Sequence, residues 1–220
     1  MKRNIDLSEI SDGKLYTIND MAKLGCQDCA GCCACCKGMG SSIILDPYDV
    51  YRLEKCLNKG FEELLQEHLE LNVVDGVILP NLRLTGEEEA CSFLNDEGRC
   101  SIHDSRPGIC RLFPLGRYYE NGDYKYFLQI KECQKSNRTK VKISKWLDTP
   151  DYPKYKNFIL RWHYFLNGVE EMLAEVTEED FSKQCCMLIL QAFYGKKYDT
   201  TRGFYEQFEE RMQLVEEALS

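Results

Sequence analysis

The most reactive side chains of the chain gather in one short stretch, residues 26–36, in which six of eleven residues are cysteine. Thiols at this density cannot all pack as small apolar groups. Disulfides between them would need specific Cα and Cβ separations, which such short spacings do not provide comfortably. Thiolates are soft ligands that suit zinc, iron–sulfur clusters or Cu(I). The stretch therefore predicts the core of a metal site.

A second group of cysteines follows at wider spacing, each beside a predicted turn. The turn at Asn95–Gly98 puts Cys91 and Cys100 on adjacent strands of one hairpin. The turn Arg-Pro-Gly at residues 106–108 presents Cys110, and Cys133 comes just past a hairpin that turns at Asn121-Gly122. Loops that deliver single cysteines in this way are typical of zinc ribbons and iron–sulfur proteins.

The candidate ligands follow by separating these cysteines from those in helical segments. Cys56, Cys185 and Cys186 lie beside apolar residues at helical spacing, and we expect them to pack as small buried hydrophobes. Ten cysteines of the thirteen remain as candidates: Cys26, Cys29, Cys32, Cys33, Cys35, Cys36, Cys91, Cys100, Cys110 and Cys133. Four thiolates complete a zinc site or a [4Fe–4S] cluster, so the set allows two such sites or one larger cluster.

Neither group of cysteines alone offers a comfortable shell of four ligands. The adjacent Cys35 and Cys36 direct their side chains differently, so both seldom bind one zinc ion. We therefore predict that Cys36 and Cys110 share a metal centre, since closing a long loop adds only slowly growing entropy.

The other polar residues near the cysteines are less specific. His103 is a candidate ligand or a polar loop residue, His163 is expected in a helix amid aromatic residues, and His68 is expected at the surface. Four arginines lie near the second cysteine group in sequence: Arg99, Arg106, Arg111 and Arg117. They either balance the charge of the thiolates or donate hydrogen bonds to sulfur or to an anionic ligand. The alternative is that they are solvated turn residues in ordinary ion pairs.

The elements that must position these residues predict an α+β fold. Asp46-Pro47 opens a helix that runs to about residue 58, and a second helix is expected at 61–69. Short strands are expected at 14–18 and 43–45. Two hairpins are expected to turn at Asp75-Gly76 and Asn121-Gly122. After Lys140 helical periodicity takes over, with helices expected at 155–176, where Asn167-Gly168 is a candidate break, at 177–194 and at 201–219. We expect a cysteine-cluster domain at 1–148 and a helical region at 149–220 packed on it.

Composition restricts the class of protein. The chain has 220 residues and a net charge of −8, which argues against sequence-independent binding of nucleic acid. It has no run of eighteen apolar residues, so we expect no membrane span. Residues 1–12 lack the apolar core of a secretory signal. We therefore expect a cytoplasmic protein, in which cysteines serve more often as ligands than in disulfides; a protein partner remains open.

With these motifs, the chain resembles the CxxCxxCC cysteine-cluster family, the YkgJ-like proteins described as zinc- or iron-chelating. The segments that carry the resemblance span roughly residues 26–133: Cys29-x-x-Cys32-x-x-Cys35-Cys36, Leu45 with Asp49, Cys91-Ser-Phe-Leu94, Gly98-Arg-Cys100-Ser-Ile102 and Arg106-Pro107-Gly-Ile-Cys110-Arg111-Leu-Phe113-Pro114.

The resemblance also selects among the ten candidates. The family's short distance from the cysteine pair to Leu45 favours Cys29 rather than Cys26 as the start of the first motif, so Cys26 and Cys33 become extra thiols. Cys26 keeps the three-residue spacing and is the better extra candidate. The predicted ligands are then Cys26, Cys29, Cys32, Cys35, Cys36, Cys91, Cys100, Cys110 and Cys133.

Two functions follow from the resemblance. The first is a metal-binding protein that holds an iron–sulfur cluster or zinc, with a structural or electron-transfer role. The alternative is a protein lysine N-methylase that uses S-adenosylmethionine, because flagellin lysine N-methylases share this type of cysteine cluster. The chain is short for such an enzyme and shows no clear methyl-donor fingerprint, so we favour the first.

Overall fold

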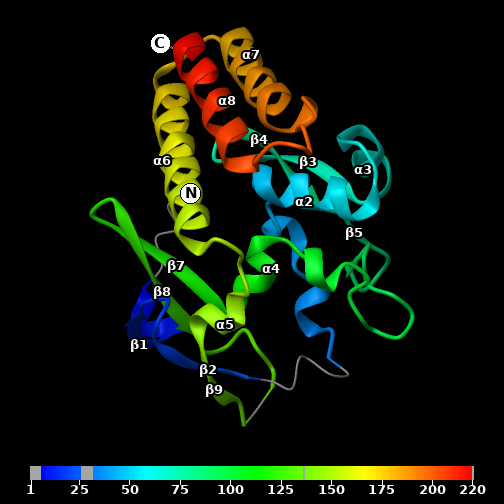
Figure 1. Ribbon diagram of the computed structural model, residues 1–220, viewed down its shortest axis with the longest axis vertical. Helices are drawn as coiled ribbons and strands as arrows, with labels where there is room; N and C mark the ends of the chain where they lie inside the picture. Colours follow the sequence, from blue (N-terminus) through cyan, green and yellow to red (C-terminus); the bar gives the residue numbers. More distant parts are fainter. Residues whose placement is uncertain (1–5, 26–31, 136, 220) are drawn as a thin grey trace.

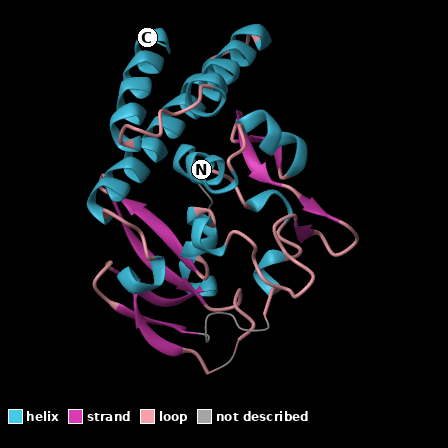
Figure 2. Ribbon diagram, turned by 45° about the vertical axis from the view of Figure 1, so that its right-hand side comes forward, coloured by secondary structure: helices cyan, strands magenta, loops and turns pink. Residues whose placement is uncertain are grey.

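The computed structural model describes residues 6–25, 32–135 and 137–219. As predicted, it combines helices with small antiparallel sheets in an α+β arrangement. Three long C-terminal helices stand together at one end of the molecule, and the β1–β8–β7 sheet and the β2–β9 ribbon lie at the other (Figures 1 and 2). Among the described residues, no helix is both long and apolar enough to cross a membrane.

The helices of the first part are short and those of the last part are long. The α-helices are α1 (Leu7–Ile10), α2 (Pro47–Leu57), α3 (Phe61–Glu67), α4 (Gly108–Leu112), α5 (Ile143–Leu147), α6 (Tyr152–Glu175), α7 (Glu179–Leu190) and α8 (Phe204–Leu219). Single turns of other helix types are η2 (Ala34–Cys36), η3 (Gly40–Ser42), η4 (His103–Ser105) and η5 (Gln191–Gly195).

Within the described residues, the strands form one three-stranded sheet, in the order β1–β8–β7, and three separate antiparallel pairs, β2–β9, β3–β4 and β5–β6. Their bounds are β1 (Ser11–Tyr16), β2 (Met21–Gly25), β3 (Leu69–Val74), β4 (Val77–Leu82), β5 (Leu84–Thr85), β6 (Ala90–Cys91), β7 (Leu115–Glu120), β8 (Asp123–Gln129) and β9 (Thr139–Lys142). The hairpins predicted at Asp75-Gly76 and Asn121-Gly122 are confirmed as β3–β4 and β7–β8.

One continuous hydrophobic core joins the two parts of the chain, from Ala22 to Val215. Aromatic side chains dominate it where α6 and α8 meet: Phe158 and Phe208 contact edge to face, with ring centroids 4.7 Å apart. The Tyr194 hydroxyl donates to the Leu45 carbonyl at 2.9 Å, which ties the helical end to the residue that precedes the N-cap of α2. The helices therefore support the segment from which α2 begins.

Helix α2 begins as its sequence predicts. The Asp46 carboxylate accepts from the Asp49 amide at 2.9 Å, and the Asp49 carboxylate accepts from the Asp46 amide at 3.3 Å. This reciprocal pair satisfies two amides that the first turn leaves without helical partners. Pro47 takes the first position, where no amide donor is needed.

Four predictions need correction. Residues 43–45 form only an isolated bridge, Ile44 to Asn81, rather than a strand. Helix α6 continues through Asn167-Gly168 without a break, since its apolar stripe is unbroken on both sides. Cys56 is exposed, because Leu57 rather than Cys56 continues the packed face of α2.

The fourth correction is His68, which is not a surface residue. Its side chain is 20% exposed and stacks on Phe93 with ring centroids 4.2 Å apart. It ends α3 where the chain meets the hairpin of Cys91 and Cys100, so packing covers it. Cys185 and Cys186 are buried in α7, in line with the predicted packing role.

Candidate metal centre

The first segment of the candidate centre is fastened beside strand β6. The turn η2 is closed by a bond from the Cys36 amide to the Cys33 carbonyl at 2.9 Å. Lys37 then bridges Ala90, and the Gly38 amide donates to the Glu89 carbonyl at 3.1 Å. Since Cys91 directly follows Ala90, this pairing brings the end of the cysteine-rich segment to the first cysteine of the second group.

The hairpin at residues 91–101 carries two further thiols. Leu94 bridges Cys100, and the Ser101 amide donates to the Phe93 carbonyl at 2.8 Å. At its tip, Gly98 has φ of +70°, a conformation that glycine adopts without strain. A Cβ placed on Gly98 would lie 3.9 Å from the Cys33 sulfur, so the tip reaches the first segment. Cys91 and Cys100 flank this turn as predicted, but they do not lie on paired strands: Cys91 belongs to β6 and pairs with Leu84 of β5, whereas Cys100 bridges Leu94.

The third segment, helix α4, is held by the first turn of α2. The Gly108 amide donates to Asp49 Oδ1 at 2.7 Å, and the Asp49 side chain is only 2% exposed. A Cβ on Gly108 would lie 2.6 Å from the Tyr155 hydroxyl, so only glycine fits there. Arg52 donates to the Asp104 carbonyl nearby. Cys110, two residues after Gly108, is thereby fixed relative to α2.

The three segments bring five thiols into one electrostatic environment: Cys35, Cys36, Cys91, Cys100 and Cys110. A hydrogen bond from the Cys36 thiol, together with the charge of Arg106, lowers the pKa of Cys35 to about 6. The same bond raises the pKa of Cys36, and the charges of Cys91 and Cys110 raise it further.

Burial raises the pKa of the remaining three thiols. It raises the pKa of Cys110, and the negative charges of Asp49 and of neighbouring thiols add to that effect. It likewise raises the pKa of Cys91 and Cys100; the charge of Cys35 raises the pKa of both further, and that of Cys100 adds to the shift of Cys91. Each thiolate makes ionisation of its neighbours less favourable. A bound metal cation offsets this repulsion and allows several thiols to be ionised at once.

A scan against protein families matches residues 26–144, more than half of the chain, to CxxCxxCC, described as a "putative zinc- or iron-chelating domain". The chain belongs to the CxxCxxCC family. The matched region contains all three segments described above. No curated protein matches this chain, and neither does any solved structure.

The donor set of this CxxCxxCC domain fits a soft metal. Four thiolates complete a zinc site or an iron–sulfur cluster, and the five converging thiols supply that number. Within residues 6–25, 32–135 and 137–219, however, no three Cys, His, Asp or Glu side chains stand at the spacing that a metal ion needs. The thiols converge from three segments without closing on one point.

Of the other predicted ligands, the structure describes Cys32 and Cys133. Cys32 and Cys133 are half-buried and form no disulfide, but they are not among the main groups that shift the five pKa values. Cys26 and Cys29 lie outside the described residues. His103 has a half-exposed side chain whose Nε2 lies 2.9 Å from Arg106 Nη1, as fits a polar loop residue of the domain.

The arginines divide between two tasks. The charge of Arg106 helps to lower the pKa of Cys35 and opposes the rise in the pKa of Cys100, so Arg106 is a cation close to the thiols. Arg111 is 4% exposed and lies over the Tyr155 ring at 5.8 Å, while Arg117 donates to the Tyr155 hydroxyl at 3.1 Å. These two join the CxxCxxCC domain to α6 rather than facing the cysteines.

Sequence reasoning missed two residues that organise this centre, Asp49 and Gly108. Asp49 was noted only as part of the Leu45 to Asp49 motif, and Gly108 only as a turn residue. The signal that points to their contact is that both belong to motifs of one family. An acidic residue in a first helical turn that is also buried must find a donor elsewhere.

Proposed function

We propose that this CxxCxxCC domain holds an iron–sulfur cluster or zinc through thiolates of Cys35, Cys36, Cys91, Cys100 and Cys110, with a structural or electron-transfer role. The observation that carries the proposal is that the segment of Cys36 pairs beside β6, which carries Cys91, although the two are more than fifty positions apart. The charges of Cys91 and Cys110 also act on Cys36. A disulfide or packing role would not require so many half-buried thiols beside one arginine.

The proposal includes Cys26, Cys29, Cys32 and Cys133 as additional ligands, which would allow a second four-thiolate site. Thiols in such numbers bind metal only while they stay reduced. We therefore place the protein in a reducing compartment, the cytoplasm.

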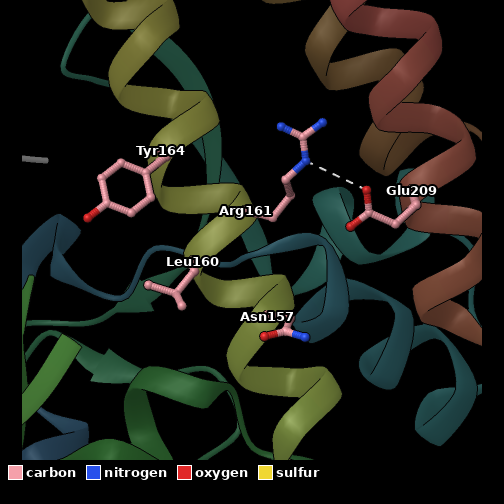
Figure 3. Close-up of a pocket in the computed structure, with 5 residues that line it drawn as sticks. All are labelled: Asn157, Leu160, Arg161, Tyr164 and Glu209. Carbon is pink, nitrogen blue, oxygen red and sulfur yellow. Dashed lines mark ion pairs between the residues drawn. The ribbon is translucent and has the colours of Figure 1, made fainter. Parts of the chain in front are cut away.

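The lysine N-methylase alternative has no support in the described residues. A shallow, open hollow of about 380 Å³ lies between α6 and α8. Figure 3 shows four of its lining residues, Asn157, Leu160, Arg161 and Tyr164, on α6, with Arg161 paired to Glu209 of α8 at 3.6 Å. No cysteine lines it, and the thiol segments lie elsewhere in the fold.

Anaerobic purification followed by metal and sulfide analysis tests the proposal. We expect stoichiometric iron with acid-labile sulfide and a brown colour, or stoichiometric zinc without colour. A finding of zinc alone would rule out the iron–sulfur cluster. The whole proposal falls if protein with all thirteen thiols reduced binds neither metal on reconstitution.

A further inference from the structure

One face of the β2–β9 ribbon is basic. Lys23 stands directly opposite Lys140, and Met21 stands opposite Lys142. Residues that are opposite one another, and residues two apart in a strand, point to the same side of a sheet. All four side chains are exposed, and Met21 is 54% exposed. The basic ribbon face, Met21, Lys23, Lys140 and Lys142, is thus a patch with three ammonium groups around one apolar side chain.

The opposite face of the ribbon is anchored to the framework of the metal centre. Ala22 and Leu24 are buried, and both strands contact α5. Helix α5 in turn contacts α4, which carries Cys110. The basic ribbon face therefore has a fixed position one helical layer from the thiols, at the lower end of the molecule in Figure 1.

The charge of this patch stands out from the rest of the chain. Residues 133–147 contain five basic and no acidic residues, in a chain whose net charge is −8. In the described part of the chain, no ion pair of 4.0 Å or less joins Lys23, Lys140 or Lys142 to a carboxylate. Like charges directly opposite one another in a ribbon are destabilising. The pair Lys23 and Lys140 therefore costs stability that a glutamate at either position would restore.

We propose that the basic ribbon face docks an acidic surface patch of a partner protein. Methionine is enriched at the centres of protein interfaces, with charged residues at the rim, and Met21 among three lysines has that arrangement. A patch this small suits a weak, transient contact that charge complementarity guides. Such a contact beside the metal centre would serve exchange of electrons or metal, and the docking itself does not depend on which metal is bound.

Other acidic surfaces fit the patch less well. Three lysines contribute about 3 kcal/mol toward an anionic membrane, at about 1 kcal/mol each, which is too little for stable attachment. Single-stranded nucleic acid is bound through aromatic platforms, and the basic ribbon face contains no aromatic residue. Lysines can also prevent an open strand edge from pairing with another chain. The experiment below distinguishes this role from docking.

The test uses the full, metal-replete chain and a fluorescent decaglutamate peptide, with binding followed by fluorescence anisotropy. The variant K23E/K140E should weaken binding about tenfold or more, and added salt should remove the difference. The control K55E/K125E makes the same change in net charge at exposed sites on α2 and β8, and it should change binding less than about twofold. Metal content should stay unchanged in both, so failure of the docking proposal is distinct from failure of the metal centre.

A milder variant, K23Q/K140Q, removes the repulsion without adding charge and guards against misfolding. It should fold and lose peptide binding in the same direction. Equal loss in the control overturns the proposal, as does wild-type protein that does not bind the peptide. Binding to phosphatidylserine vesicles or oligouridylate that exceeds peptide binding and is lost in K23Q/K140Q also overturns it. Aggregation of K23Q/K140Q with peptide binding intact assigns the lysines to edge protection instead.

Discussion

The thiol-bearing segments and the C-terminal helices are held in place by different means. Around Phe208, which is fully buried, the aromatic rings of α6, η5 and α8 contact one another directly. The segments around Cys36, Cys91 and Cys110 are joined by a few backbone hydrogen bonds and carry half-buried thiols. Phe93, Ile102 and Leu112 join the cysteine end to the shared core. We therefore expect packing to stabilise the helical end, and packing together with a bound metal to stabilise the cysteine end.

Removal of the metal should have the largest effect and should separate the two regions. Structural zinc contributes about 10–16 kcal/mol to the folding of small domains. We expect chelation to abolish hydrogen-exchange protection and protease resistance at residues 32–38 and 91–110, while α6 and α8 keep theirs. Restoring the metal provides the control. Unchanged protection of residues 91–110 after complete metal removal would show that packing alone holds them.

The converse change is Phe208→Ala, which opens a cavity in the helical end. Truncation of a buried phenylalanine costs about 3–5 kcal/mol. Denaturant unfolding should show this loss, whereas metal content per folded chain should equal that of the wild type. A loss of metal in proportion to stability would mean that the two regions are not separately stabilised.

Two glycines provide a matched pair, Gly108 at the junction of the regions and Gly168 within the helical end. Gly108→Ala would push a methyl group against the Tyr155 hydroxyl and Asp49, and we expect a loss of about 1–3 kcal/mol together with lower metal content. Gly168→Ala, in the exposed interior of α6, meets no atom within 4 Å and should gain about 0.5–1 kcal/mol. Thermal melts and metal analysis distinguish them; equal effects would refute the close fit at Gly108.

Asp46 should make stability depend on pH, with a change that is small over any one pH unit. Burial raises the pKa of Asp46 from its usual 3.8 to about 8. Between about pH 4 and pH 8 the folded state therefore keeps a proton that the unfolded state has already released. Stability falls as pH rises through this range, by at most about 1.4 kcal/mol per pH unit. Asp46→Asn keeps the helix cap and should flatten this slope in denaturant titrations. Asp6→Asn, at an exposed cap, is the control, and equal slopes in all three proteins would contradict the burial of Asp46.

The sequence predicted the elements that local chemistry decides. Asp46-Pro47 opens α2 because a cap and a proline act within one turn. Asp75-Gly76 and Asn121-Gly122 form the tight turns of two hairpins because these residues tolerate positive φ, and all four adopt it. The turns that present Cys91, Cys100 and Cys110 were found in the same way.

Contacts between distant segments were not predicted from the sequence. The pairing of β2 with β9 joins residues more than a hundred positions apart, and nothing local to either strand signals it. The bond from Gly108 to Asp49 and the stacking of His68 on Phe93 likewise depend on tertiary packing. Cys56 was placed on the wrong side of α2 because an apolar stripe defines a helix face only to within about one residue.

The most direct test of the shared metal centre compares Cys110→Ser with Cys56→Ser. Both replace one thiol, but Cys110 lies among the five converging thiols and Cys56 is exposed on α2. We predict that Cys110→Ser lowers metal content and increases hydrogen exchange at residues 32–38 as well as in α4, and that Cys56→Ser matches the wild type. Full metal content in Cys110→Ser, or exchange that rises in α4 while residues 32–38 stay protected, would contradict a centre shared by the two segments.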